Sequence, residues 1–100
     1  MKRVAARLKR AGDFSQVRCA YLEINPPSIS AAIGEAASRG AREIRVLPYF
    51  VLSGRHVNEH IPQTIRRARK KNPSVRIKLC AYLGYDKRIV DVVQDRIRRG

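Results

Sequence analysis

The chain has 100 residues, 44% of them hydrophobic, and its 22 lysines and arginines against 8 aspartates and glutamates give a formal net charge of +14. This length and apolar content are typical of one globular domain with one core, and they exclude a disordered chain. No apolar run approaches the roughly 18 to 20 residues of a membrane-spanning helix, so we expect no membrane partner. The charge indicates an anionic partner, a role in solubility, or both. Nucleic acid and a small polycarboxylate ligand are the two candidate partners.

Two features indicate a reducing compartment. The beginning of the chain lacks an apolar stretch, so no secretory signal is visible. Cys19 and Cys80 are far apart in the sequence and each falls in a predicted strand, which favours small buried thiols over a metal knuckle or a disulfide framework. We therefore expect a cytoplasmic protein.

The first predicted element is a basic amphipathic helix over residues 1–11, which Gly12 would end. Its narrow apolar face is formed by Val4, Ala5, Leu8 and Ala11. Such a segment can also be a transit peptide or a membrane-surface helix. Because it leads directly into a well-patterned fold, we interpret it as part of the domain.

Three strand–helix units follow along the chain. Alternating or continuous apolar residues predict strands at 16–22, 43–48 and 75–81. Apolar residues at helical spacing predict helices at 29–39, at about 57–71 and after residue 86. Ser28 and Asp86 are suited to cap the first and last of these helices, and Pro62 is tolerated only near the first turn of the middle one. The expected buried stripe of the middle helix consists of Val57, Ile61, Ile65 and Ala68.

This order of elements indicates the fold class. Alternating strands and helices are typical of an α/β domain with a parallel sheet and right-handed crossovers. The third strand alternates apolar residues with Arg76 and Lys78, so one of its faces is wet and we expect it at a sheet edge. In such sheets the ligand site lies beyond the carboxyl ends of the strands.

Two candidate metal ligands follow predicted strand ends. Glu23 and His56 lie about one strand–helix–strand repeat apart, and each is beside a segment broken by proline or glycine. Carboxylate and imidazole groups are suitable ligands for divalent cobalt, iron or nickel. Either residue alone would be an ordinary solvated side chain, but their equivalent positions favour a shared site. Arg55, next to His56, could pair with a ligand carboxylate.

The residues His56, Glu59 and His60 also spell the inverted zinc-peptidase motif His-x-x-Glu-His. We disfavour a zinc peptidase because the chain leaves little room for a substrate cleft and because Pro62 follows only two residues later. A surface position for His60 is the simpler interpretation.

The densest basic run contains Arg66, Arg67, Arg69, Lys70 and Lys71. It is either a solvated helix face or a patch that contacts phosphates. No aromatic residues interleave it, so it offers no platform on which bases could stack.

Two stretches together resemble a known family. The first is Tyr21-Leu22-Glu23-Ile24 with Pro27-Ser28-Ile29, and the second runs from Gly40 through Pro48-Tyr49-Phe50-Val51-Leu52 and Gly54-x-His56-Val57 to Ile61-Pro62. They are similar to the class II sirohydrochlorin chelatases, the small enzymes that insert cobalt or iron during cobalamin and sirohaem synthesis. The likeness covers about residues 17–97.

This resemblance implies a fold, a reaction and a site. The fold would be chelatase-like and related to flavodoxin, with helices on both faces of the sheet. The reaction would be ATP-independent insertion of a divalent metal, itself a substrate, into a sirohydrochlorin-like tetrapyrrole, with no organic cofactor. His56 and Glu23 would be the catalytic residues and metal ligands. The substrate pocket would include Pro48, Tyr49, Phe50, Val51, Leu52, Ser53 and Arg55.

The chain departs from the family pattern at its beginning. The family opens with a strand ending in Gly-His-Gly-Ser, whose histidine is another catalytic ligand, and this sequence contains no such segment. When this sequence is matched to the family pattern, that strand would lie upstream of residue 1. We therefore expect residues 1–100 to be one domain, truncated relative to the family. Three outcomes are open: a fragment, a strand borrowed from a partner chain or homo-oligomer, or direct pairing of the flanking strands at 17–22 and 43–48.

Two functions other than catalysis are also open. A basic module that binds nucleic acid or an acidic partner would account for the charge, and its affinity would fall steeply with salt. A non-catalytic carrier of tetrapyrrole or metal would bind stoichiometrically without turnover. We favour the chelatase.

Overall fold

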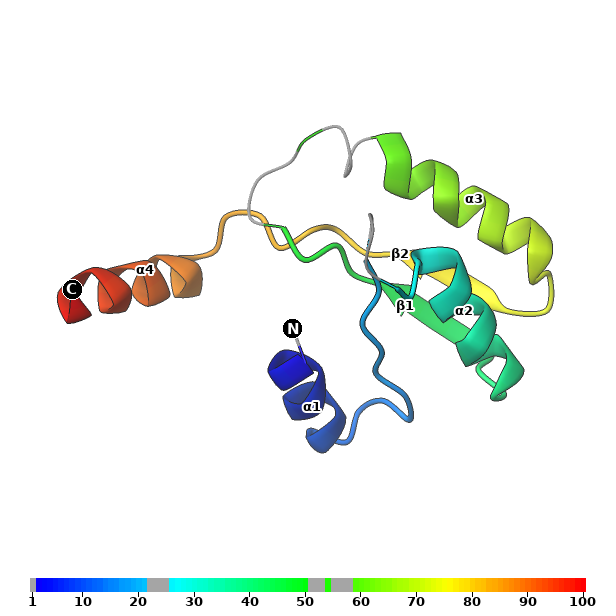
Figure 1. Ribbon diagram of the computed structural model, residues 1–100, viewed down its shortest axis with the longest axis horizontal. Coiled ribbons are helices and arrows are strands. Elements are labelled where there is room, and N and C mark those ends of the chain that lie inside the picture. The colour runs from blue at the N-terminus through cyan, green and yellow to red at the C-terminus, as the bar shows by residue number, and fades with distance from the viewer. Residues whose placement is uncertain (1, 22–25, 51–53, 55–58) are drawn as a thin grey trace.

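The computed structural model describes residues 2–21, 26–50, 54 and 59–100. In these residues the chain forms four helices and two strands, shown in Figure 1. In chain order they are α1 (Lys2–Arg10), α2 (Ile29–Ser38), β1 (Glu43–Val46), α3 (Ile61–Lys71), β2 (Arg76–Leu79) and α4 (Lys87–Arg99). Over the same residues, each helix is too short or too polar to cross a membrane. The predicted α/β class is confirmed.

The sheet consists of β1 and β2, which pair in parallel. Ile44 lies opposite Ile77 and Val46 opposite Leu79, so these four apolar side chains share one face. The alternate positions, where Glu43 lies opposite Arg76 and Arg45 opposite Lys78, form the other face and are exposed. The expected wet face of the third predicted strand is thereby confirmed.

The core lies between the apolar face of the sheet and helices α2 and α3. Its buried members are Ile33 from α2, Ile61, Ile65 and Ala68 from α3, and Ile77 from β2. The spacing of the three α3 residues brings them onto one side of that helix, which confirms the predicted stripe at these positions. Val57, the fourth predicted member, lies outside the described residues.

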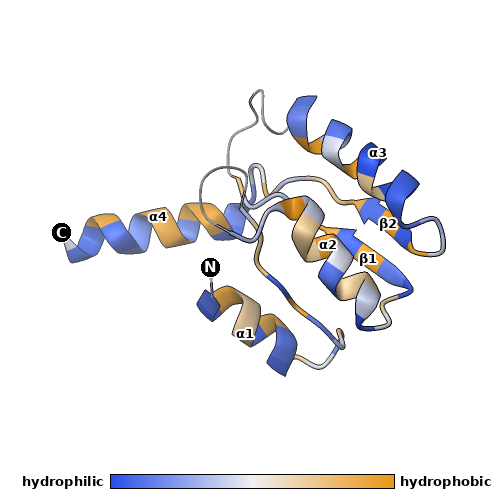
Figure 2. Cartoon of the chain, turned by 45° about the vertical axis from the view of Figure 1, so that its right-hand side comes forward, coloured by the Kyte–Doolittle hydropathy of each residue, from blue (hydrophilic) through white to orange (hydrophobic). Residues whose placement is uncertain are grey.

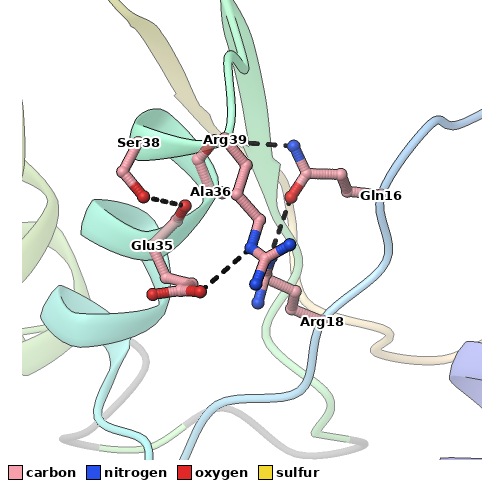
Figure 3. A network of polar contacts seen from close by, with 6 residues as sticks. All are labelled: Gln16, Arg18, Glu35, Ala36, Ser38 and Arg39. Carbon is pink, nitrogen blue, oxygen red and sulfur yellow. Dashed lines mark hydrogen bonds and ion pairs between the residues drawn. The ribbon is translucent and has the colours of Figure 1, made fainter.

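The strand predicted at 16–22 is not formed over its described part. Residues 16–20 belong to no ladder, and Tyr21 makes only an isolated bridge to Ser28. Figure 3 shows how the segment is held instead: the Gln16 side chain, which also accepts a hydrogen bond from Arg18, donates one to the Ala36 carbonyl at 3.5 Å. Direct pairing of this segment with β1 was one of three expected outcomes, and it is wrong for the described residues. Apolar alternation does not make a strand without a neighbour to complete its hydrogen bonds.

Helices α1 and α4 contribute no buried residue. In Figure 1, α4 projects from the rest of the molecule, and the radius of gyration of 15.1 Å exceeds the roughly 13 Å typical of a 100-residue domain. Figure 2 shows apolar positions along α4. Two of the apolar residues of this helix, Val93 and Ile97, are 50% and 73% exposed. The flavodoxin relation implied helices on both faces of the sheet. In the described residues, only α2 and α3 build the core.

Local signals set the helix ends as expected. The Ser28 hydroxyl accepts a hydrogen bond from the Ala31 amide at 3.1 Å, which caps α2. Pro62 lies in the first turn of α3, where its missing N–H costs no intrahelical hydrogen bond. Asp86 caps α4 by accepting from the Arg88 amide at 2.9 Å.

The Asp86 cap should make the start of α4 sensitive only to strong acid. The Arg88 side chain donates to both carboxylate oxygens, at 2.8 and 2.9 Å, and with the Arg88 amide it holds the pKa of Asp86 well below its ordinary value of 3.8. Because the folded pKa is depressed, the cap stabilises α4 above pH 3.8 and is lost as the pH falls through the folded value. We expect the Asp86 carboxyl carbon, followed by NMR, to titrate with a midpoint below 3.8.

The matched control is Asp86→Asn, which still caps a helix but carries no charge to titrate. The acid-induced shift of the Arg88 amide resonance should disappear in this variant. A wild-type midpoint at or above 3.8 would contradict the pairing of Asp86 with Arg88.

Candidate functional site at the carboxyl edge of the sheet

The loops that follow β1 and β2 are joined at the carboxyl edge of the sheet. The Cys80 amide donates to the Val46 carbonyl at 2.8 Å, which extends the ladder just past both strands. Further along, the Gly84 amide donates to the Phe50 carbonyl at 3.2 Å. These two hydrogen bonds hold residues 47–50, which include the first part of the predicted pocket, beside the loop that leads to α4. Such an edge is the expected place for a ligand in a parallel sheet.

Gly84 is the residue that permits this contact. Its φ of +61° lies in the left-handed region, and an added Cβ would approach the Tyr82 ring at 3.4 Å. A residue with a side chain would therefore be strained there. Gly84 falls within the range of the family likeness, but its hydrogen bond to Phe50 joins positions distant in the chain and was not foreseen.

The described part of the predicted pocket combines fixed and exposed groups. Pro48 is buried and Phe50 packs against the core, so the backbone between them is anchored at both ends. Tyr49 and Leu47 point outward and are 48% and 51% exposed. A tyrosine ring and a leucine side chain on a fixed backbone can pack against the flat face of an aromatic ligand. Exposure of Leu47 was not predicted.

The two ends of the segment that carries Glu23 are joined by a backbone hydrogen bond. The Tyr21 amide donates to the Pro27 carbonyl at 2.9 Å, immediately before the cap of α2. Tyr21, Pro26 and Pro27 also line a groove together with Lys2 and Cys19. Glu23 itself lies outside the described residues, so its predicted role as metal ligand remains a prediction. Of the residues that flank the undescribed part, Tyr21 is hydrogen-bonded to Pro27 close to the start of α2.

The segment that carries His56 is bounded by Phe50 and by the buried Ile61 at the start of α3. Within it, Gly54 is described and exposed. The predicted site residues Val51, Leu52, Ser53, Arg55 and His56 lie outside the described residues. The proximity of Glu23 to His56, and the geometry of the alternative zinc motif, are therefore not tested.

His60 and Glu59 are described, and both are exposed. The His60 carbonyl accepts a hydrogen bond from the Thr64 hydroxyl at 3.0 Å, which ties it to the first turn of α3. The surface position expected for His60 is confirmed. Over the described ranges, no three histidine, cysteine, aspartate or glutamate residues gather closely enough to hold a metal ion.

The parallel sheet, with a fixed and partly apolar segment beyond its carboxyl edge, places the chain among α/β proteins, in which ligands bind at that edge. Similarity to known proteins identifies the family within this class. The chain is 34% identical over 90 residues to the chloroplastic sirohydrochlorin ferrochelatase of Arabidopsis thaliana, covering 90% of this chain and 40% of that protein. It is 30% identical over 84 residues to the sirohydrochlorin cobaltochelatase of Sulfurisphaera tokodaii, covering 84% of this chain and 67% of that one.

A solved structure agrees with these relatives. The sirohydrochlorin chelatase SirB of Bacillus subtilis subspecies spizizenii, in complex with cobalt, matches with a TM-score of 0.80 and 28% identity, covering 98% of this chain and 43% of SirB. The family model named CbiX matches residues 1–100. The chain therefore belongs to the CbiX family, the class II sirohydrochlorin chelatases, as the resemblance implied. It spans 30 to 40% of the length of the first curated relatives it matches.

Proposed function

We propose that the protein inserts a divalent metal, cobalt or iron, into sirohydrochlorin or a closely related tetrapyrrole without using ATP. The observation that carries this proposal is the match of the CbiX family to residues 1–100, a range that includes both Glu23 and His56. The names of the Arabidopsis and Sulfurisphaera relatives support the substrate and the two metals.

The proposed chemistry follows from what metal insertion requires. A divalent ion must be held near the macrocycle and then transferred to its nitrogens, while two pyrrole N–H protons leave. We assign the holding of the ion to His56 and Glu23, because a neutral imidazole and a carboxylate bind such ions well. Either group can also accept a departing proton.

The macrocycle would lie at the carboxyl edge of the sheet. The exposed Tyr49 and Leu47, on a backbone fixed by Pro48 and Phe50, supply an apolar surface for its ring face. We assign Val51, Leu52 and Ser53 to the same pocket, and Arg55 to pairing with the acetate and propionate groups at the ring periphery. The net charge of +14 would favour the approach of such a polyanion.

The test is an insertion assay on the purified 100-residue chain. Sirohydrochlorin is mixed with Co²⁺, or anaerobically with Fe²⁺, and its change in absorbance is followed with and without protein. We expect an insertion rate that rises in proportion to protein concentration, exceeds the spontaneous rate and is unaffected by added ATP. A rate equal to that in buffer would refute the proposal. Stoichiometric binding of metal or tetrapyrrole without turnover would favour a carrier instead.

A further inference from the structure

The strongest unexplained feature outside the candidate site is the charge of the α3–β2 unit. Between Ile61 and Leu79 the chain has 7 cations and no acid, namely Arg66, Arg67, Arg69, Lys70, Lys71, Arg76 and Lys78. All seven are exposed. Among the described residues, none of them forms an ion pair with a carboxylate, although the Arg69 side chain donates to the Ile77 carbonyl at 3.0 Å.

The charges of α4 are arranged differently. There Arg88 pairs with Asp86, and Arg96 and Arg99 both pair with Asp95. Acids therefore accompany most of the cations of α4, whereas those of α3 have none. Helix α1 is likewise basic, with five cations and no acid in Lys2–Arg10. The excess positive charge therefore lies on α1 and on the α3–β2 unit, and it is not spread evenly along the chain.

The helix dipole explains only part of the pattern. Arg69, Lys70 and Lys71 lie in the last turn of α3, where positive charge is favourable. Arg66 and Arg67 lie further from that end. Each is four residues before another cation on the same helix, and the two positive charges repel each other. Such repulsion destabilises an isolated helix. An anionic partner bound to this face would screen the positive charges and so relieve that destabilisation.

A groove extends this basic surface past the end of α3. It is lined by Lys71 and by Arg42 and Arg76, which adjoin the amino ends of β1 and β2, together with small and polar residues including Gly40 and Ser74. Its one acid, Glu43, is engaged by Arg45 at 3.4 Å. The groove lies at the amino edge of the sheet, whereas Tyr49 and Phe50 follow the carboxyl end of β1, so the proposed tetrapyrrole site does not account for it.

We propose that the α3 face and this groove bind the phosphate backbone of double-stranded nucleic acid. The helix supplies Arg66, Arg67 and Lys70, the groove supplies Arg42 and Arg76, and Lys71 belongs to both. Within the described part of α3 and β2 no large apolar side chain is exposed. A membrane-binding helix needs such side chains to insert, and single-strand binding needs aromatic rings on which bases stack. Backbone contact with a duplex needs neither.

The test uses the whole chain and fluorescence anisotropy with mixed-sequence 25-base-pair duplexes, one of DNA and one of RNA. Affinity should fall with salt along a line of log K against log[salt], with a slope of about −0.9 for each phosphate contacted. Replacing Arg66, Arg67 and Lys70 together with glutamine should weaken binding at least about tenfold and make the slope shallower by about 3. Binding of both duplexes supports a site for the phosphate backbone that DNA and RNA share. Binding of one duplex alone supports a site for that type of nucleic acid.

The matched control replaces Arg3, Arg7 and Arg10 of α1 with glutamine, so that both triple variants carry the same net charge. Circular dichroism shows whether each variant keeps its helices. The proposal requires the α1 variant to bind clearly more tightly than the α3 variant and to keep a steeper dependence of log K on log[salt]. Equal losses in the two variants, tighter binding to a single strand, or equally strong α3-dependent binding to phosphatidylserine vesicles would overturn it.

Discussion

Replacing His56 with alanine is expected to reduce the rate of cobalt insertion into sirohydrochlorin by about a hundredfold or more. In the proposed mechanism this imidazole holds the metal and can accept a pyrrole proton, and a positioned acid–base group contributes roughly 10²- to 10⁴-fold to a rate. The measurement is the initial insertion rate under saturating Co²⁺. Calorimetric titration of the apoprotein with Co²⁺ should show weaker binding in the same variant.

His60 is the matched control because it is the other histidine of the chain, it is exposed, and it lies close to His56 in the sequence. His60→Ala leaves intact the backbone carbonyl that binds Thr64, so the helix start should persist and most of the rate should remain. If His56→Ala kept its rate within about threefold, the proposed role would fail. If His60→Ala lost as much as His56→Ala, the metal ligand would be misassigned.

Replacing Ile65 with alanine is expected to lower the free energy of unfolding by about 2 to 5 kcal/mol. Ile65 is 1% exposed and lies in the cluster formed by α2, α3 and β2. Removing three carbons there leaves a cavity that neighbouring side chains fill only in part. Because a small domain has only about 5 to 15 kcal/mol of stability in total, urea unfolding should show a much lower midpoint.

Ile97→Ala is the control, since it makes the same chemical change on α4, where Ile97 is 73% exposed. We expect its unfolding free energy to stay within about 0.5 kcal/mol of the original chain. A loss similar to that of Ile65→Ala would mean that α4 buries its apolar side in solution. The pair therefore tests both the core and the placement of α4.

Most elements could be predicted from local patterns. The helical spacing of Ile61, Ile65 and Ala68 indicated a buried stripe, and Ser28 and Asp86 marked helix starts, because capping and amphipathicity act within a few residues. Strand β2 was recognisable from apolar residues alternating with Arg76 and Lys78. These features depend on near neighbours in the chain, so the sequence carries them directly.

The strand at 16–22 shows where such reasoning fails. Its alternation is as clear as that of β2, yet residues 16–20 join no ladder. A strand exists only when a neighbour supplies hydrogen bonds, and β1 forms its ladder with β2. Helices α1 and α4 likewise have an amphipathic pattern, yet they contribute no buried residue.

For the candidate site, the chemistry came from residue identities and the geometry from the fold. Glu23 and His56 were identified by residue type and family likeness, since ligand chemistry belongs to the side chain itself. The contact of Phe50 with Gly84, and the exposure of Tyr49 on an anchored backbone, required the tertiary structure. Local interactions therefore set the helices and their ends, whereas long-range pairing decided which strands formed and which loops met.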